Sequence, residues 1–180
     1  PVKMITSGEG GMVVTNDEKL YKWMLKYRNH GMVDRDHIEF WGENFRLQPL
    51  QAIVAKVGLK KLESTIIKRN QNAARYDQGL KNLELFIKIP PRKRNHLETF
   101  SLYMGLFNDR DNLLNYLIAN DIEVKIHYPI PLHKQEAAKK DCRFDEEKLK
   151  NSEYQAKHLM TLPVHQFLSN IQIDYTIKKI

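Results

Sequence analysis

The feature that most constrains this chain is a long apolar stripe in its middle, which begins just after Pro49. The stripe has the three- and four-residue spacing of one helix face, and it consists of Leu50, Ile53, Val54, Val57, Leu62 and Ile66. Proline suits the first turn of a helix because its missing N–H group would have no partner there. We therefore expect a helix that begins at Pro49 and continues, kinked or straight, to about Leu83. Such a helix divides the chain into a part before it and a part after it.

The part after the helix has the pattern of a small α+β domain. The expected elements are strands at 86–89, 100–104 and 122–127, a helix from Asp111, and helices at about 146–160 and 169–179, separated by Leu162-Pro163. Strands that follow one another in this order favour an antiparallel sheet covered by helices. We expect residues 83–180 to form this domain.

The part before the helix looks like the end of a larger α/β domain. A glycine-rich turn at residues 8–11 precedes the apolar run 12–14, which predicts a short strand buried on both faces. Asn16-Asp17 can cap a helix that stops at Gly31, and residues 32–47 form an unusually long loop. We therefore place a domain boundary near residue 82, with the long helix as the link.

Composition narrows the class of protein without naming it. The 29 Lys and Arg against 22 Asp and Glu give a net charge of +7, which favours anionic partners. A non-catalytic module that binds nucleic acid is therefore an alternative, although no signature of such a module is present. The densest basic cluster, residues 92–94, is expected to be a solvated loop. We find no apolar run long enough for a membrane span. The one cysteine, Cys142, has polar neighbours typical of an exposed loop, and a chain with a single cysteine fits a reducing compartment such as the cytoplasm.

Lys3 is the first candidate for chemistry. A lysine that stands on rigid backbone beside a packed glycine turn can form a Schiff base with an aldehyde cofactor. A lone lysine in this position is more often a surface residue, and the glycine cluster lacks the spacing of the common phosphate-binding loops. The residues alone therefore leave both interpretations open.

Longer segments resemble a known family. The segment KMITSGEGGMVVTND, residues 3–17, closely resembles the pyridoxal-phosphate (PLP) lysine segment of the DegT/StrS family of sugar aminotransferases. Later landmarks of that family match in the right order, at 28–31, 42–47, 51–52, 122–135 and 162–163. The resemblance covers essentially all 180 residues.

The resemblance implies the C-terminal half of a fold type I aminotransferase, with PLP as cofactor and a homodimer with shared active sites. The intact enzyme would move an amino group from an amino acid, with L-glutamate expected, to a keto group of a nucleotide-linked deoxyhexose. Such sugars enter surface polysaccharides, including lipopolysaccharide. The family's chains are about twice as long, so we expect this half alone to be inactive. The sugar and the carbon, C3 or C4, stay open, as does a domain that has lost its chemistry.

The resemblance also implies roles for single residues. Lys3 would bind PLP covalently and move a proton, and Asn44 would hydrogen-bond the PLP phosphate of the neighbouring subunit. Arg46 would add positive charge nearby, and His30, His127 and Tyr128 would lie near the substrate. From the residues alone, Asn44 suits a turn, Arg46 an exposed surface, His30 a helix end and His127-Tyr128 the end of a strand. Four other histidines, His37, His96, His158 and His165, have no spacing suited to a metal site.

Overall fold

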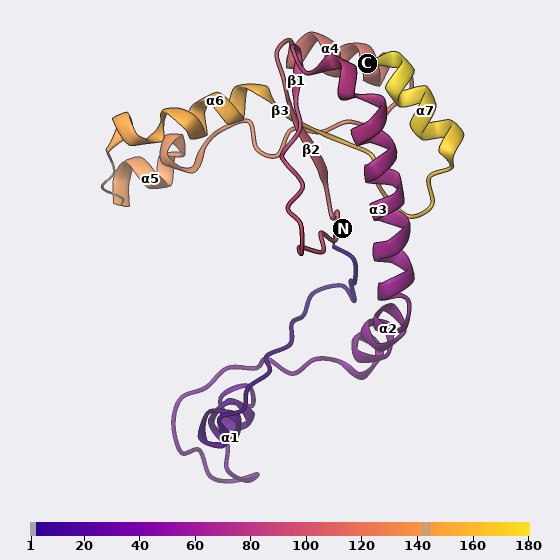
Figure 1. Ribbon diagram of the computed structural model, residues 1–180. Coiled ribbons are helices and arrows are strands. Elements are labelled where there is room, and N and C mark those ends of the chain that lie inside the picture. The colour runs from indigo at the N-terminus through magenta and orange to yellow at the C-terminus, as the bar shows by residue number, and fades with distance from the viewer. Residues whose placement is uncertain (1–2, 142, 144) are drawn as a thin grey trace. The chain divides into compact units, whose positions relative to one another are not determined.

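The computed structural model describes residues 3–141, 143 and 145–180, so the predicted loop thiol Cys142 lies outside the described residues. The described chain forms two compact units, residues 3–62 and residues 63–180 (Figure 1). The boundary near residue 82 concerns the domains of a longer fold and stays a prediction.

The first unit contains two helices, α1 (Glu18–Tyr27) and α2 (Pro49–Lys60). The predicted cap of α1 is confirmed, because the Asp17 carboxylate accepts hydrogen bonds from the Lys19 and Leu20 amides at 2.8 and 3.1 Å. These bonds satisfy two of the amides that a helix start leaves without partners. The second helix begins at Pro49, as predicted.

The strand predicted at residues 12–14 is wrong for this structure. Met12, Val13 and Val14 lie outside any strand and are 77%, 72% and 84% exposed. A strand exists only where neighbouring backbone supplies its hydrogen bonds, and no described residue pairs with this run. Among residues 3–62, Gly31 alone is buried, so this unit has no apolar core of its own.

The long central helix is confirmed with one break. The helix α2 ends at Lys60, α3 (Leu62–Gly79) begins two residues later, and the 3₁₀ turn η1 (Lys81–Leu83) ends the run at the predicted place. Only α3 has buried residues, namely Arg69, Asn72, Ala73 and Tyr76. The apolar stripe is continuous in the sequence, but α2 has no buried residue whereas α3 is partly buried.

The second unit is built on a three-stranded antiparallel sheet, as predicted. Its strands β1 (Ile87–Lys88), β2 (Tyr103–Phe107) and β3 (Leu159–Leu162) lie in the order β1-β2-β3. The sheet register places Ile87 opposite Phe107 and Tyr103 opposite Leu162. The central strand therefore begins three residues later than predicted.

The third strand is not the one predicted. Residues 122–127 make one isolated pair, Lys125 with Thr161, whereas Leu159–Leu162 forms the full ladder with β2. Residues 122 and 124 are buried and their neighbours exposed, so the segment has a strand's alternation without its pairing. Short apolar runs do not reveal which of them will lie next to the central strand, since that choice depends on distant residues.

Four helices and two 3₁₀ turns complete this unit. They are α4 (Arg110–Ala119), η2 (Leu132–Lys134), α5 (Glu136–Asp141), η3 (Glu146–Leu149), α6 (Lys150–His158) and α7 (Asn170–Lys179). The predicted helices from Asp111 and at 169–179 are confirmed. The predicted helix at 146–160 is a 3₁₀ turn followed by α6, and α5 was not predicted.

The core of the second unit lies between the sheet and the helices α3, α4 and α7. Its most buried side chains come from all of these elements: Tyr76, Tyr103, Phe107, Leu117, Met160 and Ile173. The rings of Tyr76 and Tyr103 meet at a tilt of 37°, with centroids 4.9 Å apart. Gly79 lets α7 approach α3, because an added Cβ would come within 2.6 Å of Ile177 Cδ1. Figure 1 shows these two helices side by side.

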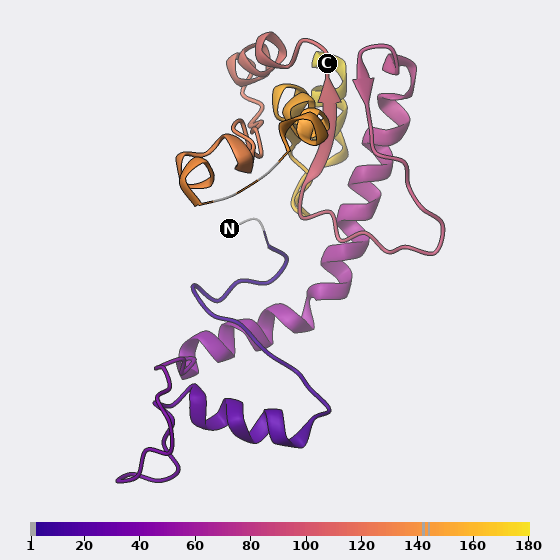
Figure 2. The ribbon, with the colours of Figure 1, turned by 90° about the vertical axis from the view of Figure 1, so that its left-hand side faces the viewer.

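A polar network ties the connection between β1 and β2 to α3. The Arg92 guanidinium donates from Nε and Nη2 to the two carboxylate oxygens of Asp77, at 2.9 and 2.8 Å, and it lies 4.9 Å from the ring centre of Phe100. The hydroxyl of Tyr103 donates to Asp77 Oδ1 at 2.7 Å. Hydrogen bonding to Asp77 raises the pKa of Arg92. Figure 2 shows the connection running beside α3 before it returns to the sheet.

Residues 92–94 form an exposed loop, as predicted, and the ion pair of Arg92 with Asp77 also ties this loop to α3. We expect Arg92→Ala to lower the free energy of unfolding by about 1–2 kcal/mol, because a two-pronged charged hydrogen bond and a ring contact are lost together. Urea unfolding would measure this, with the exposed neighbour Lys93→Ala as a control that changes it by less than about 0.5 kcal/mol. Equal losses in the two variants would contradict the network's role.

The uneven burial predicts uneven protection from amide hydrogen exchange. In this 180-residue chain, we expect amides of α3, β2 and α7 to exchange at least about a hundredfold more slowly than those of residues 10–28. Mass spectrometry at low protein concentration would measure the difference. Strong protection of residues 10–28 in a monomer would show that they have a core within this chain.

Candidate functional site

The glycine turn after Lys3 lies against α2. The side-chain nitrogen Nε2 of Gln51, in the first turn of α2, donates to the backbone carbonyl oxygen of Glu9 at 2.8 Å. Gly8 has a φ of +80°, a conformation that glycine adopts without steric cost. Lys3 itself is exposed, so its amine is accessible beside a turn that is held from one side. The sequence singled out the turn but gave Gln51 no role.

Two segments that match family landmarks pair with each other. Backbone hydrogen bonds run from His30 N to Glu43 O at 3.0 Å, from Glu43 N to Tyr27 O at 2.7 Å and from Phe45 N to Arg28 O at 2.9 Å. The loop 32–47 therefore returns to the end of α1. This pairing places Asn44 beside Asn29, its partner in an isolated bridge.

Two glycines permit this close approach. A Cβ on Gly42 would come within 2.5 Å of the Gly31 nitrogen and of the Tyr27 carbonyl oxygen. A Cβ on Gly31 would come within 1.6 Å of the Phe40 carbonyl oxygen, and the φ of Gly31 is +72°. His30 also has a positive φ, 61°, and its backbone takes part in the turn. His30 thus has a structural place after α1, and its predicted substrate contact stays a prediction.

Aromatic side chains support the same region. The ring of Trp23 stacks on Tyr27 with centroids 4.7 Å apart and on Phe40 at 5.7 Å, and Phe45 meets the edge of Tyr27 at 6.1 Å. Stacked rings favour one arrangement of the loop on α1. The long loop is therefore held against α1 by the rings of Phe40 and Phe45.

Asn44 and Arg46 form a polar pair next to the glycine turn. Arg46 Nε donates to Asn44 Oδ1 at 3.0 Å, so this bond uses the amide oxygen of Asn44 and not its N–H₂ group. Both side chains line a pocket of about 830 Å³. Residues 9–11 of the glycine turn, Gln51 and aromatic residues of α1 line it as well. The structure thus brings Asn44, Arg46 and the glycine turn together, whereas Lys3 and His30 are not among the lining residues.

His127 and Tyr128 belong to the second unit and line a different pocket of about 700 Å³, next to α6. His127 Nδ1 lies 3.3 Å from Thr161 Oγ1, which holds the ring against β3. The buried His133 in the same pocket lies with Nε2 3.1 Å from Glu153 Oε1. This hydrogen bond holds the pKa of Glu153 below its usual value. His133 stands within a resembling segment, but no spacing signal distinguished it.

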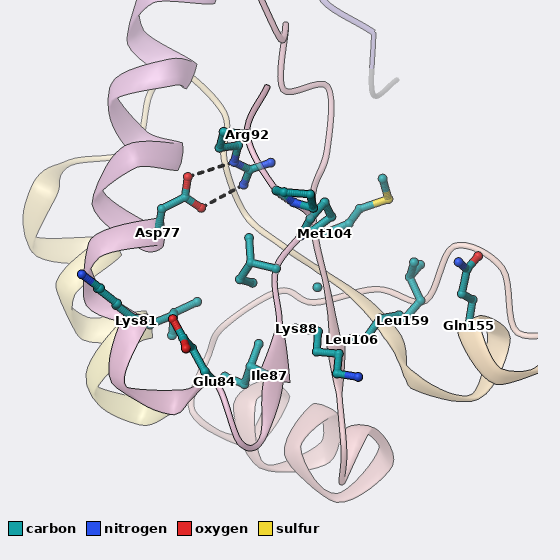
Figure 3. Close-up of a pocket in the computed structure, with 15 residues that line it drawn as sticks. Asp77, Lys81, Glu84, Ile87, Lys88, Arg92, Met104, Leu106, Gln155 and Leu159 are labelled. Carbon is teal, nitrogen blue, oxygen red and sulfur yellow. Dashed lines mark hydrogen bonds and ion pairs between the residues drawn. The ribbon is translucent and has the colours of Figure 1, made fainter. Parts of the chain in front are cut away.

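A third pocket, of about 770 Å³, lies over the sheet of the second unit (Figure 3). None of the predicted site residues lines it, and Figure 3 shows its Arg92 turned toward Asp77 and paired with it. Its apolar lining comes from all three strands of the sheet and from residues 89–91, which follow β1. Because the Arg92 guanidinium is already paired with Asp77, this pocket is a weaker candidate for binding an anionic substrate.

The described residues contain no group of three or more His, Cys, Asp or Glu side chains arranged to hold a metal ion. Within the same residues, no helix is long and apolar enough to cross a membrane.

Comparison with known proteins identifies the family of this chain. A sequence model of the DegT/DnrJ/EryC1/StrS aminotransferase family matches residues 1–180. This chain belongs to that family. Family membership favours the enzyme interpretation over the basic nucleic-acid-binding module that composition also allowed.

Individual relatives are similar over nearly all of the chain. The chain is 32% identical over 166 residues to a UDP-2-acetamido-2-deoxy-3-oxo-D-glucuronate aminotransferase of Pseudomonas aeruginosa, covering 92% of this chain and 45% of the relative. It is 29% identical over 171 residues to a dTDP-3-amino-3,6-dideoxy-alpha-D-galactopyranose transaminase of Aneurinibacillus thermoaerophilus, covering 95% and 46%.

The fold prediction is confirmed by solved structures. The crystal structure of DesV from S. venezuelae matches with a TM-score of 0.85 and 30% identity, covering 92% of this chain and 44% of that one. The small antiparallel sheet and the helices around it thus belong to the C-terminal half of a fold type I sugar aminotransferase. The chain spans about half the length of the curated relatives it matches.

The pairing of the two landmark segments can be tested through its glycines. We expect Gly42→Ala to open the pairing, because a Cβ would collide with two backbone atoms, and overpacking of this kind costs about 1–3 kcal/mol. The amides of His30 and Phe45 should then exchange roughly tenfold faster or more, measured by NMR. Gly11→Ala is the matched control, because a Cβ there meets nothing within 4 Å. Unchanged exchange in Gly42→Ala would contradict the close approach.

Proposed function

We propose that this chain is the C-terminal half of a PLP-dependent aminotransferase that aminates a keto sugar carried on a nucleotide. The observation behind the proposal is the family match over residues 1–180. Lys3 precedes the glycine turn that Gln51 of α2 contacts at Glu9. The intact enzyme takes the amino group from an amino acid, with L-glutamate as the expected donor. The chain supplies the second half of that machinery and needs the first half to act.

The residues of the first unit fit PLP, a phosphorylated aldehyde. Lys3 offers an exposed primary amine on a short segment that packs against α2. Asn44 offers an amide N–H₂ group and Arg46 a guanidinium, both in a pocket lined by the glycine turn, and these donors suit a phosphate. When bound, PLP supplies an electron sink that lets an amino group pass between an amino acid and a keto sugar.

Each predicted residue has a distinct task in this proposal. Lys3 would hold PLP through its Nζ amine, and that amine, once free, would take and return a proton. Asn44 donates to the phosphate bound by the partner subunit of a homodimer, and Arg46 orients Asn44 through its 3.0 Å hydrogen bond while adding positive charge. His30, His127 and Tyr128 contact the substrate.

A nucleotide-linked sugar is the substrate class that the charge and the relatives support. The two relatives described above are named for UDP- and dTDP-linked sugars. The net charge of +7 favours approach of a diphosphate. We propose that the product serves surface polysaccharide synthesis, such as that of lipopolysaccharide, and that the enzyme works in the cytoplasm.

The assignment of Lys3 is tested in the full-length protein that contains this chain. Borohydride reduction in the presence of PLP should fix the label on Lys3, and Lys3→Ala should lower kcat by at least about a thousandfold, because the covalent link and the proton carrier are lost together. Peptide mass spectrometry locates the label, with the nearby exposed Lys19→Ala as a control that retains activity. A label on another lysine would overturn the assignment.

The shared site is tested by mixing subunits. Lys3→Ala and Asn44→Ala homodimers should each be weak, whereas their heterodimer should regain up to about half of the native activity, because one of its two sites receives both native residues. The heterodimer is purified with two different affinity tags and compared with each parent. No recovery in verified heterodimers would show that Lys3 and Asn44 do not act across the interface.

A further inference from the structure

The segment that bears Lys3 needs support from outside itself. Residues 3–15 contain neither helix nor strand, so the backbone ladder of a secondary structure does not fix them. A catalytic amine misplaced by about 1 Å can lose about a hundredfold in rate, because the reacting atoms must meet at a fixed distance. The contacts of this segment with neighbouring residues therefore decide how well Lys3 is placed.

Gln51 makes the polar contact in this support. Its side-chain nitrogen donates to the carbonyl oxygen of Glu9 at 2.8 Å, and its side-chain oxygen accepts from the backbone N–H of Gln48 at 3.3 Å. One amide group thus connects the first turn of α2 to the glycine turn. Only a side chain with a donor and an acceptor on the same carbon can make both bonds from this position.

Two glycines let apolar side chains complete the support. Gly58, inside α2, has no Cβ, and a Cβ there would come within 3.0 Å of Ile5 Cγ2. A Cβ on Gly10 would come within 2.8 Å of Leu47 Cδ1. Glycine inside a helix costs about 1 kcal/mol relative to alanine, so Gly58 weakens α2 while it admits Ile5.

These contacts follow one another along the two segments. Ile5 meets Gly58, Glu9 meets Gln51 and Gly10 meets Leu47, so the Lys3-bearing segment runs alongside α2 in the opposite direction. Ile5 is two residues from Lys3, and Glu9 is six residues from it. The lysine backbone is thus close to one fixed contact and is followed by two more.

We propose that Gln51 is a positioning residue for Lys3, and that it holds the glycine turn against α2 through Glu9 while Gly58 seats Ile5. The proposal rests on the proposed function, in which Lys3 bonds to PLP. Gln51 touches neither cofactor nor substrate in this role. It fixes the backbone from which the reacting amine extends, before the cofactor arrives.

The variant Gln51→Glu separates this role from helix capping. A glutamate at this position still accepts from Gln48 N–H, and a negative charge in the first turn favours the helix. It has no N–H to donate to the Glu9 carbonyl, so it should release the glycine turn alone. Lys60→Gln, an exposed change in the last turn of α2, is the matched control.

The experiment uses the full-length protein and two readouts. Without cofactor, the amides of Gly10 and Gly11 should exchange about five- to tenfold faster in Gln51→Glu than in wild type, the equivalent of one lost hydrogen bond. On addition of PLP, covalent attachment to Lys3, followed by absorbance in the near-visible, should be slower by a similar factor. The thermal unfolding midpoint and both readouts in Lys60→Gln should match wild type.

Each other outcome has a definite meaning. If Gln51→Glu exchanges and binds PLP as wild type does, Gln51 does not position Lys3. If its unfolding midpoint falls along with both readouts, Gln51 has a general structural role and the proposal is overturned. If the wild type takes up no PLP at Lys3, the proposed function fails, and the cofactor-free exchange still decides whether Gln51 holds the turn.

Discussion

The contact between the rings of Tyr76 and Tyr103 joins α3 to the central strand, and the core of the second unit is organised around it. Both rings are fully buried, and their centroids lie 4.9 Å apart. The next residue of α3, Asp77, accepts from the Tyr103 hydroxyl and pairs with Arg92. Burial, and then the hydrogen bond to Asp77, raise the pKa of Tyr103, so it stays a neutral donor over the physiological range. One turn of α3 thus fixes both the sheet and the loop that leaves it.

The first unit is held together in a different way. Only Gly31 is buried among residues 3–62, so burial of apolar area contributes little there. Backbone pairs between 27–30 and 43–45, stacked aromatic rings and close contacts at four glycines, Gly10, Gly31, Gly42 and Gly58, give it its shape. Its apolar side chains, including Trp41 at 87% exposure and the face of α2 that begins at Leu50, remain at the surface. Such a surface supports the proposal that a longer protein covers it.

Local chemistry made some elements predictable and left others undetermined. Asp17 and Pro49 mark helix starts because caps and proline act on the amides next to them in sequence. The strand at 12–14 and the strand at 122–127 were wrong in this structure because a strand is completed by distant partners. The same limit explains β3: Leu159–Leu162 pairs with Tyr103–Phe107 across more than fifty residues. The ion pair of Arg92 was not predicted because its partner Asp77 is fifteen residues away.

The sequence by itself determined the family, the lysine beside the glycine turn and the landmark residues, because these depend on residue identity and order. Tertiary structure alone decided that Asn44 and Arg46 face the glycine turn in one pocket, and that His127 and Tyr128 line another. It also gave Gln51 a partner forty-two residues earlier in the chain. The physical reason is that a hydrogen bond between distant segments forms only after the chain has folded, and residue spacing cannot state which carbonyl an amide will meet.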